Sequence, residues 1–135
     1  MKRIAPLLAA VLALGACTTF ANNFPNGPLV DGGPVRADGM ARLGEPTRVG
    51  MLVATPQVLV EDSRCPMNAR CVWAGRVVVT TRIDSPGWRE TANLTLGQPY
   101  ATHGTALALT SAEPNKMAGA AATPPSAYLF GFQPR

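Results

Sequence analysis

The chain has 135 residues and a formal net charge of +4, and only 15% of its residues are charged. Removing Lys2 and Arg3 with an export signal leaves ten basic and eight acidic side chains, a net charge of +2. This excess is too small and too dispersed for a nucleic-acid-binding surface.

Residues 1–16 have the organisation of a secretory signal. Lys2 and Arg3 form a basic start, and residues 4–14 form an apolar run. A membrane-spanning helix needs about 20 apolar residues, so this run fits a signal helix rather than a span. The tetrapeptide LGAC at 14–17 resembles a lipobox, in which cleavage precedes a cysteine that then receives diacylglycerol.

We therefore predict a lipoprotein signal peptide at 1–16 and lipidation of Cys17. The count of three cysteines supports this, because an odd cysteine in an exported protein needs a separate role. Assigning Cys17 to lipid leaves Cys65 and Cys71 as one disulfide pair. Ordinary secretion, with cleavage near Ala16 or after Ala21, is the alternative.

The residue after Cys17 favours the outer membrane. Thr18 stands where an aspartate would retain a lipoprotein at the inner membrane. We expect attachment to the bacterial outer membrane on its periplasmic face, through a tri-acylated end with enough buried methylene groups for stable anchoring. A free periplasmic or secreted form is the alternative.

Residues 17–44 are rich in Asn, Gly, Pro and Asp. Such a composition buries too little apolar surface to order itself, so we predict a disordered, flexible tether. Residues 45–135 then form a single β-domain.

Strand signals recur at short spacing through this domain, separated by Pro and Gly turns. Pro56 is expected to bend the chain between two strands, and residues 84–87 (DSPG) fit a type II turn. No segment shows a convincing amphipathic helix. The predicted strands are 48–54, 57–62, 71–83, 88–96, 105–111 and a closing strand in which Tyr128, Phe130 and Phe132 share a core face.

These elements predict an all-β fold, a small antiparallel β-sandwich, with a partly closed β-barrel as the alternative. The central prediction concerns the strand at 71–83, whose alternation puts Cys71, Trp73 and Val77 on one mainly apolar face. Trp73 is expected to pack on the disulfide.

The short loop closed by Cys65 and Cys71 is the candidate site. In one interpretation it is a structural staple in which Asp62 bonds loop amides or pairs with Arg64 or Arg76. In the other it is a presented loop in which Arg64, Met67, Asn68 and Arg70 contact a ligand or partner, because rigidly held loops commonly carry binding residues.

Two segments carry a resemblance to a known group. Residues 62–66 (DSRCP) and 71–75 (CVWAG) resemble the two-part motif of small exported bacterial proteins, many of which have lipoprotein signals. The similarity covers about 44–132 and implies a periplasmic or surface β-domain. The group has no established activity, so the resemblance assigns no catalytic residue.

Motifs for other chemistry are weak. Zinc needs three or four ligands, and His103, the single histidine, lies far along the chain from the cysteine pair. No Gly-x-Ser-x-Gly elbow is present, and we expect His103 to be a surface turn residue. The carboxylates of Glu61, Asp62 and Glu90 lack any sequence signature of a glycosidase pair. We therefore predict no catalytic residue, no metal and no cofactor.

Three functional hypotheses follow. The first is a non-enzymatic lipoprotein, held to the membrane through its N-terminal lipid, that packs on or binds another envelope component such as a protein partner. The second is a protease-inhibitor-like loop bearing Arg64 and Arg70. The third is a small-ligand or glycan site on a strand face with Arg76, Arg82 and Arg89.

Overall fold

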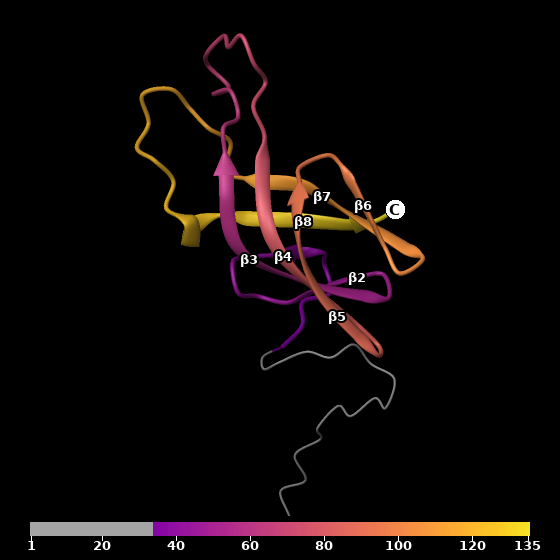
Figure 1. Ribbon diagram of the computed structural model, residues 1–135. Coiled ribbons are helices and arrows are strands. Elements are labelled where there is room, and N and C mark those ends of the chain that lie inside the picture. The colour runs from indigo at the N-terminus through magenta and orange to yellow at the C-terminus, as the bar shows by residue number, and fades with distance from the viewer. Residues whose placement is uncertain (1–33) are drawn as a thin grey trace, which may run out of the picture.

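The computed structural model describes residues 34–135. The predicted signal peptide, Cys17 and most of the predicted tether lie outside the described residues. The described strands form two four-stranded antiparallel sheets, one in the order β2-β3-β4-β5 and one in the order β1-β8-β7-β6 (Figure 1). The strands are β1 (Met40–Ala41), β2 (Thr47–Val49), β3 (Leu52–Asp62), β4 (Val77–Ser85), β5 (Trp88–Thr95), β6 (Pro99–Thr102), β7 (Thr105–Glu113) and β8 (Leu129–Pro134).

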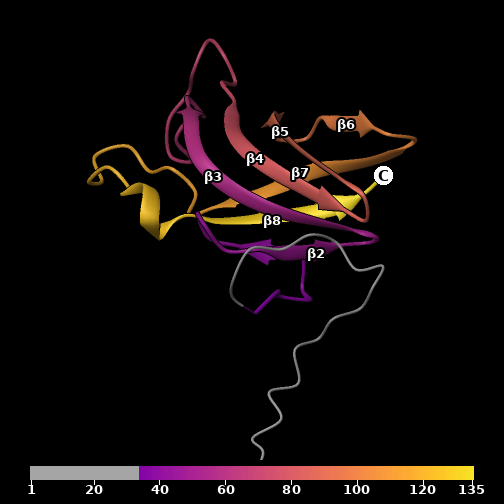
Figure 2. The ribbon, with the colours of Figure 1, turned by 60° about the horizontal axis from the view of Figure 1, so that its bottom comes forward.

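The predicted antiparallel β-sandwich is confirmed. Figure 2 shows the two sheets as layers, with β3 and β4 running across β7 and β8. The described strands do not close into a barrel. Apart from the β1–β8 pair, every hydrogen-bonded pair joins strands that are consecutive in the chain. In this part of the chain the only helix is a short 3-10 turn, Pro125–Ala127, and no helix is long and apolar enough to cross a bilayer.

The core lies between the sheets. Alternate residues of β4 point inward, and Val77, Val79 and Ile83 have no exposed surface. Phe130 and Phe132 of β8 face them from the other sheet, so the prediction that the C-terminal aromatics belong to the core is confirmed. The hairpin turn between β4 and β5 also forms where Pro86 and Gly87 predict it.

The predicted strand at 71–83 is wrong in its first part. β4 begins at Val77, and residues 71–76 belong to the loop that precedes it. Gly75 has a φ of +69°, which ends the extended conformation. Trp73 is 81% exposed, so it lies outside the core face on which its alternation with Val77 had placed it.

Other boundaries also differ from the prediction. A turn at 50–51 divides the predicted strand at 48–54 between β2 and β3, and β6 has no counterpart among the predicted strands. β3 runs through Pro56 without interruption because the pairing with β4 shifts its register next to this residue, so the missing proline N–H is tolerated. Met40 and Ala41, predicted to be tether, pair with Gly131 and Phe130 of β8. Met40 and Ala41 lie between Gly39 and Arg42, so the sequence shows too short an apolar run to predict a strand.

Candidate binding surface at the disulfide loop

The loop between β3 and β4, residues 63–76, is closed by the predicted disulfide. Cys65 and Cys71 are bonded, with their Cα atoms 5.8 Å apart. Backbone hydrogen bonds continue the hairpin beyond the regular strands, from Ser63 N to Arg76 O at 2.9 Å and from Cys65 N to Ala74 O at 3.1 Å. The loop, called the disulfide loop below, is therefore fixed by both covalent and backbone contacts.

Asp62 and Arg64 brace the base of this loop. The Arg64 guanidinium donates to both Asp62 oxygens, from Nε at 2.9 Å and from Nη2 at 2.8 Å, in the bidentate geometry of strong carboxylate pairs. It also donates to the carbonyl oxygens of Ala112 at 2.7 Å and Pro114 at 3.1 Å. The Tyr128 hydroxyl donates to Asp62 Oδ2 at 2.7 Å. This set, Asp62, Arg64 and Tyr128, ties the hairpin to the opposite sheet.

The brace shifts the pKa values of its members. Burial raises the pKa of Asp62, whose side chain is 6% exposed, but the hydrogen bonds from Arg64 and Tyr128 outweigh burial and lower this pKa to about 2. The hydrogen bond to Asp62 raises the pKa of Arg64. Burial, followed by the hydrogen bond to Asp62, raises the pKa of Tyr128. The brace is therefore an ionised pair with a neutral phenol.

A second loop, residues 114–127, supports the disulfide loop from the side. Met67 N donates to Lys116 O at 2.8 Å. Asn68 and Ala118 exchange two hydrogen bonds, of 3.2 and 2.7 Å. Lys116 Nζ donates to the carbonyl oxygen of Asp62 at 2.9 Å. Asn68 and the brace residues thus hold the two loops together as one unit.

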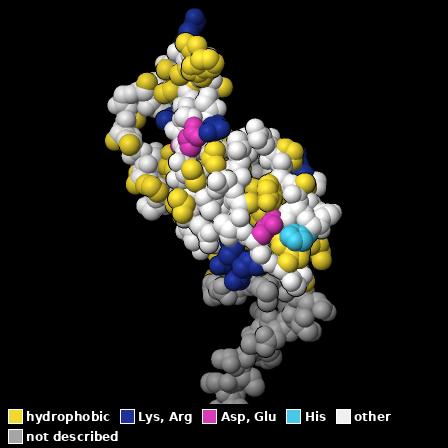
Figure 3. Space-filling view, in the orientation of Figure 1, with side chains coloured by type: hydrophobic (Ala, Val, Ile, Leu, Met, Phe, Trp, Pro, Cys, Tyr) yellow, Lys and Arg dark blue, Asp and Glu magenta, His cyan; other side chains and the backbone are white. Residues whose placement is uncertain are grey.

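The outer end of this unit is apolar. Val72 is 90% exposed, Trp73 81% and Met67 70%, and Met117 of the second loop is half exposed. We call these four residues the apolar tip. Figure 3 shows hydrophobic side chains gathered at the projecting end of the molecule, with a basic side chain at its extremity. Trp73, which was expected to pack on the disulfide from an apolar strand face, is presented to solvent instead.

The predicted basic residues of the loop have separate roles. Arg64 is 15% exposed and is used by the brace. Arg76 pairs with Glu61, Nε to Oε2 at 2.7 Å, on the exposed side of the hairpin. Arg70 is exposed, and among residues 34–135 its side chain has no hydrogen-bond or ion-pair partner.

The structure does not gather Arg76, Arg82 and Arg89 into one site. Arg82 Nε donates to the fully buried Asp84 at 3.0 Å, and Arg89 Nε pairs with the other oxygen of the same carboxylate. Arg76 lies six residues before Arg82, about 20 Å along an extended chain. Arg82 and Arg89 therefore neutralise a buried acid, and Arg76 serves the loop.

A cavity of about 440 Å³ lies beside the brace. The second loop forms its wall with small side chains, including Ala120 and Ala122, and Asp62, Lys116 and Tyr128 are among the polar residues that line it. Each of these polar groups already bonds within the brace or the loop contact. The polar side chains of Asn115 and Thr123 also line the cavity and lie outside the brace.

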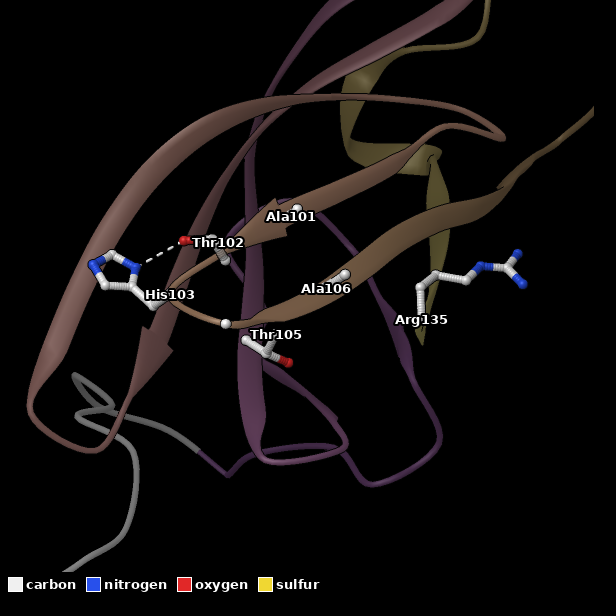
Figure 4. A pocket seen from close by; sticks show the side chains of 7 residues that line it. Ala101, Thr102, His103, Thr105, Ala106 and Arg135 are labelled. Atoms are coloured by element: carbon white, nitrogen blue, oxygen red, sulfur yellow. Dashed lines mark hydrogen bonds between the residues drawn. The ribbon is translucent and has the colours of Figure 1, made fainter.

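A different polar cluster surrounds His103, in the turn between β6 and β7. The His103 ring stacks on Trp88 with centroids 4.1 Å apart, and its Nδ1 lies 2.8 Å from Thr102 Oγ1 and 3.9 Å from Glu90 Oε2. It borders a shallow hollow of about 510 Å³ whose far side is formed by Arg135. In Figure 4 the His103 ring and the Arg135 guanidinium lie on opposite sides of the β6–β7 hairpin and do not converge.

The prediction that His103 is a turn residue is confirmed. The described residues contain no group of three or more His, Cys, Asp or Glu side chains arranged to hold a metal. Sequence reasoning identified Asp62, Arg64 and the disulfide, but it missed the contacts from Tyr128 and Lys116. Both come from segments more than 50 residues away and carry no local signal.

No family model, no curated protein and no solved structure matches the chain, so the comparisons with known proteins assign no role to these residues.

Proposed function

We propose that this protein is a membrane-anchored lipoprotein of the bacterial envelope whose β-domain acts by binding, not by catalysis. The disulfide loop and the second loop form the binding surface, and the apolar tip makes the contact with another envelope component. The proposal places the lipid on Cys17 and the domain on the periplasmic face of the outer membrane, on the strength of the signal and lipobox in residues 1–17.

The observation that carries the proposal is the rigid presentation of the apolar tip. Large apolar side chains that gather at one exposed place commonly mark interaction sites. Here Val72, Trp73 and Met67 contribute little to the core, yet the disulfide, the brace and the second loop all fix the backbone that carries them. A preorganised loop loses less conformational entropy on docking than a flexible one.

The polar residues support a binding role in a different way. Asp62, Arg64 and Tyr128 direct their hydrogen bonds to one another and to backbone carbonyls. Asp84 is likewise saturated by two arginines. A general acid or base must reach a substrate proton, and these groups are committed to internal partners.

Photo-crosslinking in cells that export the protein tests this function. Benzoylphenylalanine replaces Val72 at the tip and, as the matched control, Met51, which is 78% exposed in the turn at the opposite end of β3. We expect adducts from position 72 and none from position 51. Equal labelling from both positions, or none from position 72 in a folded, oxidised protein, would reject the proposal.

One observation favours a second candidate, an inhibitor of trypsin-like proteases. Arg70 is exposed inside a disulfide-closed loop, whereas Arg64 is held by the brace. If the loop inhibits, Arg70 is the residue that enters the protease, and Arg70→Ala abolishes inhibition while Arg76→Ala preserves it. Rapid cleavage after Arg70 without inhibition removes this candidate.

A further inference from the structure

We propose that the apolar tip, together with Arg70, docks into the headgroup region of a lipid bilayer that carries anionic lipids. The domain would then have a membrane contact of its own, separate from any acyl chain. This inference rests on the proposed function, because it names the occupant of the same surface.

The shape of the surface favours a bilayer. The disulfide loop has 14 residues and projects from the end of the sandwich beyond β3 and β4 (Figure 1). An interfacial membrane contact needs only a few apolar side chains that reach the boundary between headgroups and acyl chains. A narrow projection that ends in Val72, Trp73 and Met67 meets this requirement.

The types of side chain point the same way. Tryptophan and arginine both combine an apolar body with a polar group, which suits them to the membrane–water interface. Trp73 is exposed on the tip, and Arg70 stands in the same loop without a partner among the described residues. Val72 and Met67 add exposed apolar surface beside Trp73.

The charge of the surface selects anionic lipids. No Asp or Glu occurs between residues 63 and 75. At the base of the loop, Asp62 is neutralised by Arg64 and Glu61 by Arg76. Arg70 is therefore the uncompensated charge of the disulfide loop, and a basic side chain near a bilayer is attracted by anionic headgroups.

Part of the loop backbone is already paired within the protein. The amides of Cys65, Met67 and Ala69 all donate to backbone carbonyls. Backbone groups that enter the edge of a bilayer without partners are costly. These three amides are therefore paired before docking, whereas among the described residues the amides of Val72 and Trp73 have no backbone partner and must find one in headgroup oxygens or water.

A lipid on Cys17 and the apolar tip are able to reach the same membrane. The first described residues lie at the end of the domain opposite the loop in both ribbon views (Figures 1 and 2). The 17 residues from 17 to 33 span at most about 60 Å when extended. The 11 residues of β3 cover about 37 Å. Residues 63–69 add about 23 Å at the same rise, so the path from the start of β3 to the tip is about 60 Å, which the fully extended segment matches.

Vesicle binding by the chain from residue 18 to 135, which lacks the acyl site but keeps every described residue, tests the inference. The Trp88→Phe variant leaves Trp73 as the single tryptophan. With vesicles of phosphatidylethanolamine and phosphatidylglycerol at 3:1, we expect co-sedimentation and a blue shift of Trp73 emission. With phosphatidylcholine vesicles we expect at least tenfold weaker binding.

Variants locate the contact. In the chain that retains both tryptophans, Trp73→Ser and Arg70→Glu should each weaken sedimentation with the anionic vesicles at least tenfold, whereas Arg70→Lys keeps most of it. Met51→Ser, which removes an exposed apolar side chain at the far end, should change binding less than twofold. Unchanged melting temperatures show that the variants are folded, as expected for exposed positions.

The outcomes separate this inference from the proposed function. No binding to anionic vesicles, or equal loss with Met51→Ser, overturns the bilayer contact. If position 72 then crosslinks to a protein in cells, the proposed function stands with a protein as the occupant. If position 72 gives no adduct either, both proposals fall.

Discussion

Asp62 is the residue on which the geometry of the loop depends. Its carboxylate accepts hydrogen bonds from Arg64 and Tyr128, and its carbonyl oxygen accepts one from Lys116. The hairpin and both ends of the second loop, which lie more than 50 residues further along the chain, therefore meet at one amino acid. A buried acceptor of this kind is costly to alter, because its former donors are left without partners.

We expect Asp62→Asn to lower the free energy of unfolding by about 2 to 4 kcal/mol at pH 7, because it leaves the buried Arg64 charge uncompensated. Urea denaturation measures this. Glu61→Gln is the matched control: its pair with Arg76 is solvent-screened, so its loss should lower stability much less. Equal losses in the two variants would contradict the role assigned to the brace.

The same carboxylate predicts a pH dependence. The pKa of Asp62 is about 2 in the folded protein, below the ordinary value of about 3.9 for an unfolded chain. A lowered pKa adds stability that is fully present above about pH 4 and is lost as the pH falls toward 2, up to about 2.5 kcal/mol.

Denaturation at pH 5 and pH 2.5 should therefore show a larger loss in the wild-type protein than in Asp62→Asn. Asp38, whose pKa is also lowered to about 2 by its hydrogen bond from Arg36, is present in both proteins, so their difference reports Asp62. Parallel pH profiles would mean that Asp62 is not ionised in the fold as described.

At the scale of elements, the β3–β4 hairpin depends on Gly75. A Cβ at this position would lie 1.8 Å from the carbonyl oxygen of Ser63, and the φ of +69° disfavours other residues. The close approach of the two loop strands is possible only because this residue has no side chain. The direction of the loop is therefore set by one glycine as well as by the disulfide.

Gly75→Ala should lower the free energy of unfolding by more than about 2 kcal/mol, since the clash with Ser63 adds to the backbone strain. Gly87→Ala is the control, because Gly87 also has a positive φ but nothing within 4 Å of its added Cβ. It should cost about 1 to 2 kcal/mol. Thermal or urea melts that rank Gly87→Ala as the worse variant would exclude the close contact at Gly75.

The double variant Cys65→Ser/Cys71→Ser should lose about 2 kcal/mol of stability, the chain-entropy value for a short closed loop. Wild-type protein treated with a reducing agent should melt at the temperature of the double variant. A melting temperature that is insensitive to both changes would show that the brace and the second loop alone hold the hairpin.

For the whole molecule, stability comes from the contact between the two sheets. Phe130 is fully buried and lies in the same cluster as Ile83 and Leu109. A domain of this size has a net stability of about 5 to 15 kcal/mol, so one large core side chain is a substantial fraction of it.

Phe130→Ala should cost about 3 to 5 kcal/mol through lost burial and the cavity left behind. Val60→Ala, on a half-exposed side chain of β3, should change stability by about 0.5 kcal/mol or less. Guanidinium denaturation compares the two. Similar midpoints would contradict a core located between the sheets.

The sequence by itself determined those features that depend on neighbours along the chain. Alternation in residues 77–83, the turn at 86–87 and the aromatic spacing in the last strand were enough for an antiparallel sandwich and its core. The bond between Cys65 and Cys71 was predicted from the cysteine count together with the assignment of Cys17 to lipid, and the bond is present. These predictions succeeded because pleating and turn geometry are local properties.

Only the tertiary structure decided which side chains the loop presents. Alternation alone cannot distinguish a strand from an extended loop, so Trp73 was placed on a core face although no sheet packs against residues 71–76. The contact between Tyr128 and Asp62 spans 66 residues and depends on how the sheets cross. An apolar tip exists here because the brace and disulfide extend the hairpin past the edge of the core, where burial no longer acts on its side chains.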